Sequence, residues 1–205
     1  MLRRALITAT ALSALCLAAT NSRAAPSVGQ PAPDFTLTDT IGKTVRLSDY
    51  KGKHVVLEWV NPGCPYVRKH YNSANMQGTQ KEATAKGVVW LAINSTEPAS
   101  YDYLAPAQLA RWMVDRKAAP TLTLMDEDGK VGHAYGARTT PHMYIVDPQG
   151  TLIYAGGIDS IASARSDDIK TAVNYVKQGV SQALAGQPLS NATTRPYGCS
   201  IKYKS

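Results

Sequence analysis

The chain has 205 residues, a formal net charge of +7 at pH 7 and three cysteines. That length suits one domain with a sizeable hydrophobic core. The positive charge is modest, and the sequence has no basic cluster interleaved with aromatic residues of the kind that indicates nucleic-acid binding.

Residues 1–24 have the pattern of a secretory signal peptide. Arg3 and Arg4 precede an uncharged, mostly apolar run over residues 5–20, and a small-x-small cleavage site ends at Ala24. This run is short for a membrane-spanning helix, and no later stretch is long and apolar enough for one. We therefore expect an exported protein, periplasmic or secreted, with no stable membrane insertion after processing.

The first elements after this segment are predicted to be β-strands. Residues 26–33 contain three prolines, which favour an extended lead-in. Two short strands, over residues 34–37 and 44–47, flank a turn and predict an N-terminal β-hairpin. Residues 55–60 form a run rich in β-branched and aromatic side chains, which predicts a buried central strand.

A cysteine follows the central strand directly. The tripeptide Asn61-Pro62-Gly63 ends the strand, and Cys64 then precedes Pro65, which is favoured at the first position of a helix. This pattern places the Cys64 thiol at a helix N-terminus, where unpaired backbone N–H groups favour a thiolate.

Positive side chains follow this cysteine. Arg68, Lys69 and His70 are expected to add local positive charge, and such surroundings are typical of reactive thiols. The alternative is an inert buried cysteine, the commonest role of a free one. We favour the reactive thiol, because Cys64 lies in a loop that leads into a helix.

The rest of the chain alternates helices and strands. The last helix is expected to begin at Ser166, to bury apolar residues at helical spacing and to end at Gly186. A polar tail over residues 190–205 then carries Cys199 and has no strong secondary-structure signal. Before that helix we expect a broken helix over 65–86, a strand over 88–93, a helix from 106, a strand over 121–124, a short helix over 131–135 and a hairpin over 143–154.

This alternation predicts an α/β fold, with a central mixed sheet flanked by helices. The sequence resembles the thioredoxin-like superfamily in residues 28–35, in residues 47–53, and in the strand, loop and helix around Cys64. Thr139-Thr140-Pro141 is similar to the cis-proline segment that faces the active cysteine of thioredoxins.

Within this superfamily the chain resembles the redoxin branch, which includes the alkyl hydroperoxide reductase and thiol-specific antioxidant proteins. The motif over residues 63–67 is most similar to a peroxiredoxin-like subgroup that keeps one active-site cysteine. The resemblance implies a thioredoxin-like redoxin domain over residues 25–189, followed by the tail over 190–205. It also implies a thiol oxidoreductase with Cys64 as nucleophile, a thiol or hydroperoxide substrate, an external thiol reductant, and no cofactor or metal.

The sequence departs from both well-understood relatives. Thioredoxins carry a second cysteine three positions after the first, where this chain has Val67. Peroxiredoxins carry a proline and a threonine before the cysteine, where this chain has Leu57 and Asn61, and the arginine expected to polarise the peroxide aligns with Pro141. Asn61 and Arg68 are the candidates to replace those groups, through one hydrogen bond and one charge.

Cys199 is the natural candidate for a resolving thiol, because Cys64 and Cys199 are the only cysteines left once residues 1–24 are removed. A structural disulfide between the two is the alternative, and it would stabilise the fold by roughly 5 kcal/mol in the chain-entropy description. Both roles remain open, and they do not exclude each other.

Two further classes of function remain as alternatives. His142 follows the expected cis-proline, so a site with Cys64 is possible, and copper-delivery proteins occur on this fold. Those proteins have a second cysteine where this chain has Arg68, which leaves a thin set of metal ligands. The second alternative is a non-catalytic binding module.

Overall fold

The computed structural model describes residues 25–204, so the signal peptide expected over residues 1–24 lies outside the described residues. The strands are β1 (Thr36–Asp39), β2 (Thr44–Arg46), β3 (Val55–Trp59), β4 (Val89–Asn94), β5 (Leu122–Met125), β6 (Thr139–Thr140), β7 (His142–Val146), β8 (Leu152–Gly156) and β9 (Cys199–Ser200). The helices are η1 (Leu47–Tyr50), α1 (Pro65–Asn72), α2 (Asn75–Ala85), α3 (Pro106–Asp115), α4 (Lys130–Tyr135), η2 (Ser166–Lys170) and α5 (Tyr175–Leu184). No helix among residues 25–204 is long and apolar enough to cross a membrane.

Seven strands form one mixed sheet in the order β2-β1-β5-β4-β3-β7-β8. β3 pairs in parallel with β4 and antiparallel with β7, so Leu57 lies between Leu91 and Tyr144. The predicted N-terminal hairpin is confirmed: β1 and β2 pair antiparallel, and β1 also pairs with β5. The hairpin therefore forms one edge of the sheet, and the expected mixed sheet is confirmed.

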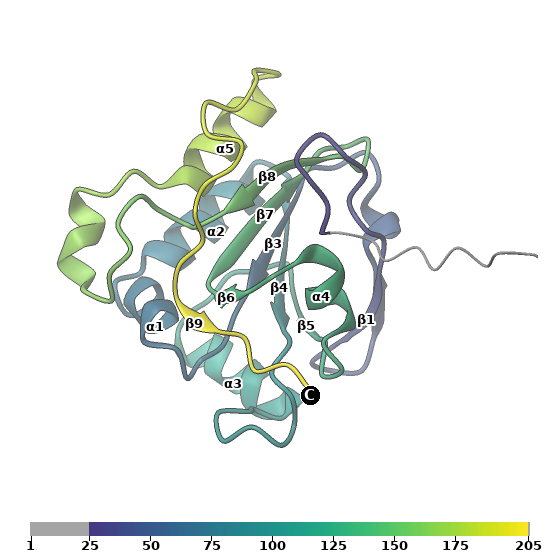
Figure 1. Ribbon diagram of the computed structural model, residues 1–205, viewed down its shortest axis with the longest axis vertical. Helices are drawn as coiled ribbons and strands as arrows, with labels where there is room; N and C mark the ends of the chain where they lie inside the picture. The colour runs from purple at the N-terminus through teal and green to yellow at the C-terminus, as the bar shows by residue number, and fades with distance from the viewer. Residues whose placement is uncertain (1–24, 205) are drawn as a thin grey trace, which may run out of the picture.

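Each face of the sheet has its own hydrophobic core, because strand side chains alternate between faces. On β3, Val56 packs into the core under α1, α2, α3 and α5, whereas Leu57 packs into the core under α4 and η1. Figure 1 shows α1 and α2 on one side of the sheet and α4 on the other. Both residues are fully buried, which fixes the register of the central strand.

The predicted break after the cysteine helix is confirmed between α1 and α2. Ala74 has a left-handed backbone with φ 59°, and α2 begins at the next residue. Pro65 is the first residue of α1, as predicted, because a proline there needs no backbone donor.

The prediction of a long final helix from Ser166 is wrong. Residues 166–170 form the short turn η2, and α5 begins only at Tyr175, where the Asn174 side chain accepts a hydrogen bond from the Lys177 backbone N–H. Asn174 is therefore the N-cap of this helix. Val173, expected on the buried face, is 49% exposed.

The tail over residues 190–205 gave no strong secondary-structure signal, yet it contains the two-residue strand β9. β9 pairs antiparallel with β6, so Cys199 lies opposite Thr140. Figure 1 shows the C-terminal segment running from α5 along the molecule, past β6, toward α4. A strand of two residues is too short to show an alternating sequence pattern. Its formation depends on pairing with the distant β6, which local sequence does not reveal.

Glycines make room for the tail at several points. A Cβ on Gly156 would lie 2.1 Å from the Thr194 hydroxyl, and a Cβ on Gly132 would lie 2.3 Å from the Tyr203 hydroxyl. Tyr203 also donates a hydrogen bond to the Ala137 carbonyl and stacks on the His133 ring. The tail is therefore packed into the domain along its length.

Candidate active site

Cys64 lies at the N-cap of α1, immediately after the loop that ends the central strand. Its backbone N–H donates to the Asn61 carbonyl at 3.0 Å, and its carbonyl accepts from the Arg68 N–H at 3.0 Å, which begins the helix. Only 2% of Cys64 is exposed. The thiol thus lies at a helix N-terminus, as predicted, but under a cover of other residues.

The loop before Cys64 is held by the two residues that we considered as peroxide-binding groups. Asn61 Nδ2 donates to Thr96 Oγ1 at 3.1 Å and to Asp102 Oδ2 at 2.9 Å, and Asn61 Oδ1 accepts from the Gly63 N–H. Arg68 Nε donates to the Pro62 carbonyl at 2.8 Å. In the described chain neither side chain makes a hydrogen bond to the Cys64 sulfur, so both shape the loop.

The Thr140–Pro141 peptide bond is cis, as the resemblance implied. Cys64 Sγ lies 3.0 Å from the Thr140 carbonyl oxygen, to which the thiol donates. The Thr140 hydroxyl is buried and has no hydrogen-bond partner within residues 25–204. The structure thus brings Cys64, Thr140 and Pro141 together at one end of the sheet.

The tail brings Cys199 to the same place. The sulfur atoms of Cys64 and Cys199 lie 2.7 Å apart, and both residues are free thiols. Burial, the hydrogen bond that the Cys199 thiol shares with Cys64, and the charge on Cys64 raise the pKa of the Cys199 thiol to about 12. Cys199 is partly exposed, whereas Cys64 is buried beneath it.

Of the positive charges expected beside Cys64, that of Lys69 is paired with an acidic residue and that of His70 is absent. Lys69 is buried, and its Nζ lies 3.4 Å from Asp159 Oδ2. Burial lowers the pKa of His70 to about 4, so this ring is neutral at pH 7. The prediction of local positive charge is wrong for His70, and the charge of Lys69 is paired, because helical spacing alone did not show that both side chains are buried against Asp159.

The structure does not bring His142 to Cys64. His142 and Tyr144 lie on the same face of the sheet, and their ring centroids are 4.5 Å apart. Tyr144 belongs to the core on that face, whereas Cys64 belongs to the core on the other face. Burial lowers the pKa of His142 to about 3. Within residues 25–204, no group of three or more His, Cys, Asp or Glu side chains is placed to hold a metal ion.

Two buried residues near the site were not singled out from the sequence. Glu58 on β3 is fully buried and accepts hydrogen bonds from the Tyr71 hydroxyl, Trp90 Nε1 and Gln80 Nε2. Burial raises its pKa to about 7. A lone acidic residue inside an otherwise apolar strand is the sequence signal for this position.

The second residue is Tyr197, two positions before Cys199. Its hydroxyl donates to Asp159, and the ring is 8% exposed. The tail segment around Cys199 is richer in aromatic residues than a solvated tail, and this is the sequence signal for Tyr197.

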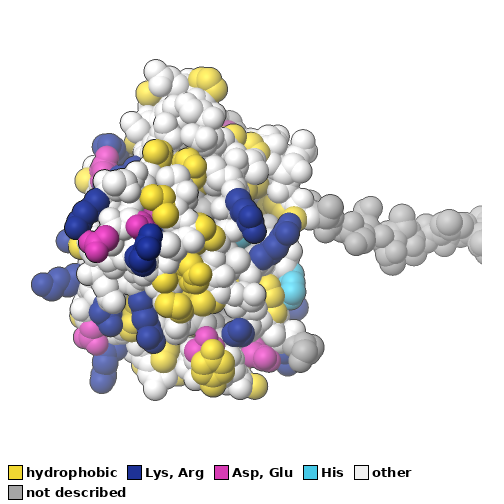
Figure 2. Space-filling model, turned by 60° about the vertical axis from the view of Figure 1, so that its left-hand side comes forward, with side chains coloured by type: hydrophobic (Ala, Val, Ile, Leu, Met, Phe, Trp, Pro, Cys, Tyr) yellow, Lys and Arg dark blue, Asp and Glu magenta, His cyan; other side chains and the backbone are white. Residues whose placement is uncertain are grey.

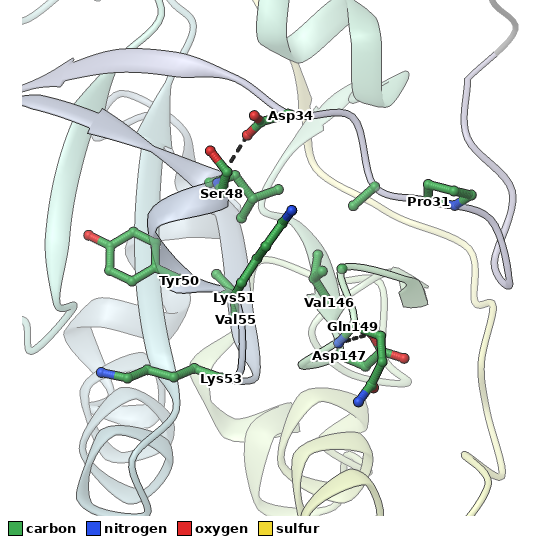
Figure 3. A pocket seen from close by; sticks show the side chains of 13 residues that line it. Pro31, Asp34, Ser48, Tyr50, Lys51, Lys53, Val55, Val146, Asp147 and Gln149 are labelled. Atoms are coloured by element: carbon green, nitrogen blue, oxygen red, sulfur yellow. Dashed lines mark hydrogen bonds between the residues drawn. The ribbon is translucent and has the colours of Figure 1, made fainter.

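One surface groove lies near this site, and one pocket lies far from it. A groove of about 520 Å³ follows the tail and is lined by Thr139, Tyr175, Arg195, Tyr197 and Gly198, among others. A pocket of about 260 Å³ lies at the opposite end of β3 (Figure 3), where Asp34, Lys51, Val55, Asp147 and Gln149 line it. The groove ends near the cysteine pair, because Gly198, which lines it, directly precedes Cys199.

The face that carries α1 and η2 has a mixed surface. Figure 2 shows Lys and Arg side chains around a central area of exposed apolar atoms, with fewer acidic side chains. The described tail contributes Arg195, Lys202 and Lys204 to the chain's positive charge and no acidic residue.

A cysteine at the first helix after a central strand, facing a cis-proline, defines a thioredoxin-like protein. The thioredoxin domain of a thiol-disulfide oxidoreductase from Bacteroides vulgatus shares this fold, with a TM-score of 0.52 at 22% identity, over 72% of this chain and 98% of that chain. An uncharacterized conserved protein from Geobacillus kaustophilus gives a TM-score of 0.72 at 28% identity, over 87% of this chain and 93% of that one.

Residues 28–155 match the AhpC/TSA family, and the chain belongs to this family. Two relatives named thiol-disulfide oxidoreductase ResA are 28% identical over 134 residues (Bacillus subtilis strain 168) and 30% identical over 137 residues (Geobacillus kaustophilus strain HTA426). These matches cover 62% and 63% of this chain, and 65% and 69% of the relatives. The match thus spans just under two thirds of the Bacillus subtilis relative.

Proposed function

We propose that this protein is an exported thiol oxidoreductase whose redox couple is the pair Cys64 and Cys199 within one chain. The observation that carries the proposal is the 2.7 Å separation of the two sulfur atoms. A disulfide needs sulfur atoms about 2.05 Å apart, so a small movement joins them. The relatives' name, thiol-disulfide oxidoreductase, supports the same chemistry.

In the reductive direction the dithiol passes two electrons to a substrate disulfide. One protein thiolate attacks a substrate sulfur, which forms a mixed disulfide and releases the first substrate thiol. The other protein thiol then displaces the second substrate thiol, and the Cys64–Cys199 bond forms. The two hydrogens of the protein thiols end on the two substrate thiols, so the exchange balances.

An external thiol returns the protein to the dithiol, and we place its attack at Cys199. Cys64 is 2% exposed and lies under the tail, whereas Cys199 is partly exposed and directly follows Gly198, which lines the groove. The Cys64 sulfur leaves as a thiolate at the N-terminus of α1, where backbone N–H groups stabilise negative charge. A second external thiol then attacks the first one in this mixed disulfide. Cys199 is released as a thiol, and the two external thiols leave joined as a disulfide.

Thr140, Pro141, Asn61 and Arg68 have supporting roles in this proposal. The Thr140 carbonyl accepts from the Cys64 thiol and holds its sulfur toward the tail. Pro141 sets the path of that carbonyl, while Asn61 and Arg68 hold the loop before Cys64.

Hydroperoxide reduction is the second chemistry that the family allows, and we give it the lesser weight. Peroxide cleavage needs donors aimed at the oxygen atoms beside the nucleophile. Asn61 donates both amide hydrogens, to Thr96 and Asp102, and Arg68 turns its Nε–H to a loop carbonyl, so Asn61 has no donor left for a peroxide. This supports disulfide exchange as the main reaction.

The experiment is oxidation of the mature protein with oxidised glutathione, followed by peptide mapping without reduction. We expect one linked peptide pair, Cys64 with Cys199, in chains of monomer mass. Replacing Cys64 or Cys199 with serine should remove that pair and lower reduction of a small disulfide at least about tenfold. If Cys199 stays free after oxidation and its replacement leaves turnover unchanged, the proposed couple is wrong.

Export is supported by the sequence pattern of residues 1–24. The expected mature protein begins at Ala25 and is found outside the cytoplasm. Intact mass of the native protein tests this directly, because retention of residues 1–24 on cytoplasmic protein would contradict it.

A further inference from the structure

A buried ionic cluster lies beneath the part of the tail that precedes Cys199 by two residues. Asp159, Lys69 and His70 are at most 3% exposed. Lys69 Nζ lies 3.4 Å from Asp159 Oδ2, and it also donates to the Ile161 carbonyl at 3.1 Å. Buried charges of this kind are stable only when they are paired and hydrogen-bonded.

Tyr197 is the tail residue that enters this cluster. Its hydroxyl donates to Asp159 Oδ1 and lies 3.1 Å from His70 Nε2. Asn75 Nδ2 lies 2.8 Å from His70 Nδ1, so a neutral His70 accepts from Asn75 and carries its proton on Nε2. The hydrogen bonds therefore run in one direction, from Asn75 through His70 and Tyr197 to Asp159.

The step from Tyr197 to Cys199 leaves the chain little freedom. Gly198 has φ +136°, and a Cβ there would lie 2.0 Å from the Thr140 carbonyl oxygen. After Cys199, the Ile201 N–H donates to the Arg138 carbonyl at 3.0 Å. The position of Cys199 is thus fixed before it in the chain by the Tyr197 hydroxyl and after it by the backbone hydrogen bond of Ile201.

We propose that Tyr197 is a positioning residue for the Cys64–Cys199 pair, and that its hydroxyl, bound between Asp159 and His70, holds Cys199 over Cys64. This inference rests on the proposed function. A thiol held in place has a high effective concentration toward its partner, because the ordering cost is already met in the dithiol. Without the hydroxyl the tail moves more freely, and closing the disulfide orders it again.

The test uses Tyr197→Phe, which keeps the ring and removes only the hydroxyl. A hydrogen bond to a charged carboxylate is stronger than one between neutral groups, so its loss should be measurable. We expect the equilibrium constant for forming the intramolecular disulfide, measured against glutathione, to fall at least about tenfold. The matched control is Tyr175→Phe, because Tyr175 lines the same groove and its hydroxyl makes no hydrogen bond within residues 25–204. That variant should match the wild type.

A second measurement does not depend on disulfide formation. In fully reduced protein, Tyr197→Phe should speed alkylation of the covered Cys64 by iodoacetamide at least about fivefold, while Tyr175→Phe leaves the rate unchanged. Circular dichroism should show that both variants keep the wild-type secondary structure, so that a change in either readout reports on the tail.

The outcomes separate the two proposals. If the wild type forms no Cys64–Cys199 disulfide but Tyr197→Phe still uncovers Cys64, the proposed function fails and the anchor stands. If the wild type forms the disulfide and Tyr197→Phe changes neither the glutathione equilibrium nor the alkylation rate, the function stands and the role of Tyr197 is overturned.

Discussion

The α-carbon of Gly198 passes so close to Thr140 that a methyl group on it would lie 2.0 Å from the Thr140 carbonyl oxygen. The same carbonyl accepts from the Cys64 thiol at 3.0 Å. One backbone oxygen therefore contacts both the cysteine of the central motif and the segment that delivers the second cysteine. Only glycine permits this approach, because Gly198 also has a positive φ.

Replacing Gly198 with alanine should displace the tail from β6. We expect a lower yield of the Cys64–Cys199 disulfide and faster alkylation of Cys64, measured by peptide mapping and mass spectrometry. Gly186→Ala is the matched control, since Gly186 also has a positive φ (+67°) but faces open space. Equal disulfide yields in both variants would show that the close contact with Thr140 has no role.

The exposure difference between the two cysteines predicts where an external thiol attaches. When oxidised protein is mixed with limiting glutathione and quenched in acid, we expect the glutathione adduct on Cys199, because Cys64 is 2% exposed. Peptide mass mapping of the quenched sample identifies the modified residue. Adducts found mainly on Cys64 would contradict the proposed order of attack.

Glu58 should make stability depend on pH. Burial raises its pKa in the folded protein from 4.5 to about 7, so the folded state binds more protons than the unfolded state between these values. Its contribution is thus fully present below pH 4.5 and is lost as pH rises through 7, by about 3 kcal/mol. Urea unfolding of the wild type and Glu58→Gln at pH 5 and pH 8 measures this.

The Gln variant cannot ionise, and its single carbonyl oxygen replaces only one of the two Glu58 oxygens, so it accepts either from Tyr71 or from Trp90 and Gln80. The wild type should therefore lose stability relative to Glu58→Gln between the two pH values. A stability difference that stays constant with pH would show that Glu58 does not change its ionisation in this range.

The reaction preference gives another prediction. Because Asn61 donates both amide hydrogens to Thr96 and Asp102, and Arg68 Nε donates to the Pro62 carbonyl, the reduced protein should consume hydrogen peroxide no faster than free glutathione does at the same pH. It should reduce a small disulfide with multiple turnovers when an external thiol is supplied. Peroxide consumption far above the glutathione rate, and dependent on Cys64, would instead support the peroxiredoxin-like reaction.

The fold around Cys64 could be predicted because its signals are local. An apolar strand, a Pro-Gly break and a proline after the cysteine specify the strand, loop and helix, and β3, Cys64 and α1 follow that pattern. The cis-proline was expected only from the resemblance to thioredoxins, and the structure confirms it.

The remaining features depend on contacts between distant residues. The two-residue β9 forms only because β6 offers a partner 59 residues earlier, at Thr140 for Cys199. Lys69 and His70 read as surface cations until Asp159 is placed between them and the tail. Asn174 and Ser166 are both good helix caps, and the local sequence did not decide between them.

The packing of the tail also has a consequence for the order in which the protein is built. Cys64 and Cys199 are 135 residues apart, and the tail rests on β6, β8 and α4, all of which precede it in the chain. Until Cys199 has been synthesised, residues 25–198 offer Cys64 no other cysteine. Among the residues that the structure describes, no third cysteine competes for either member of the pair.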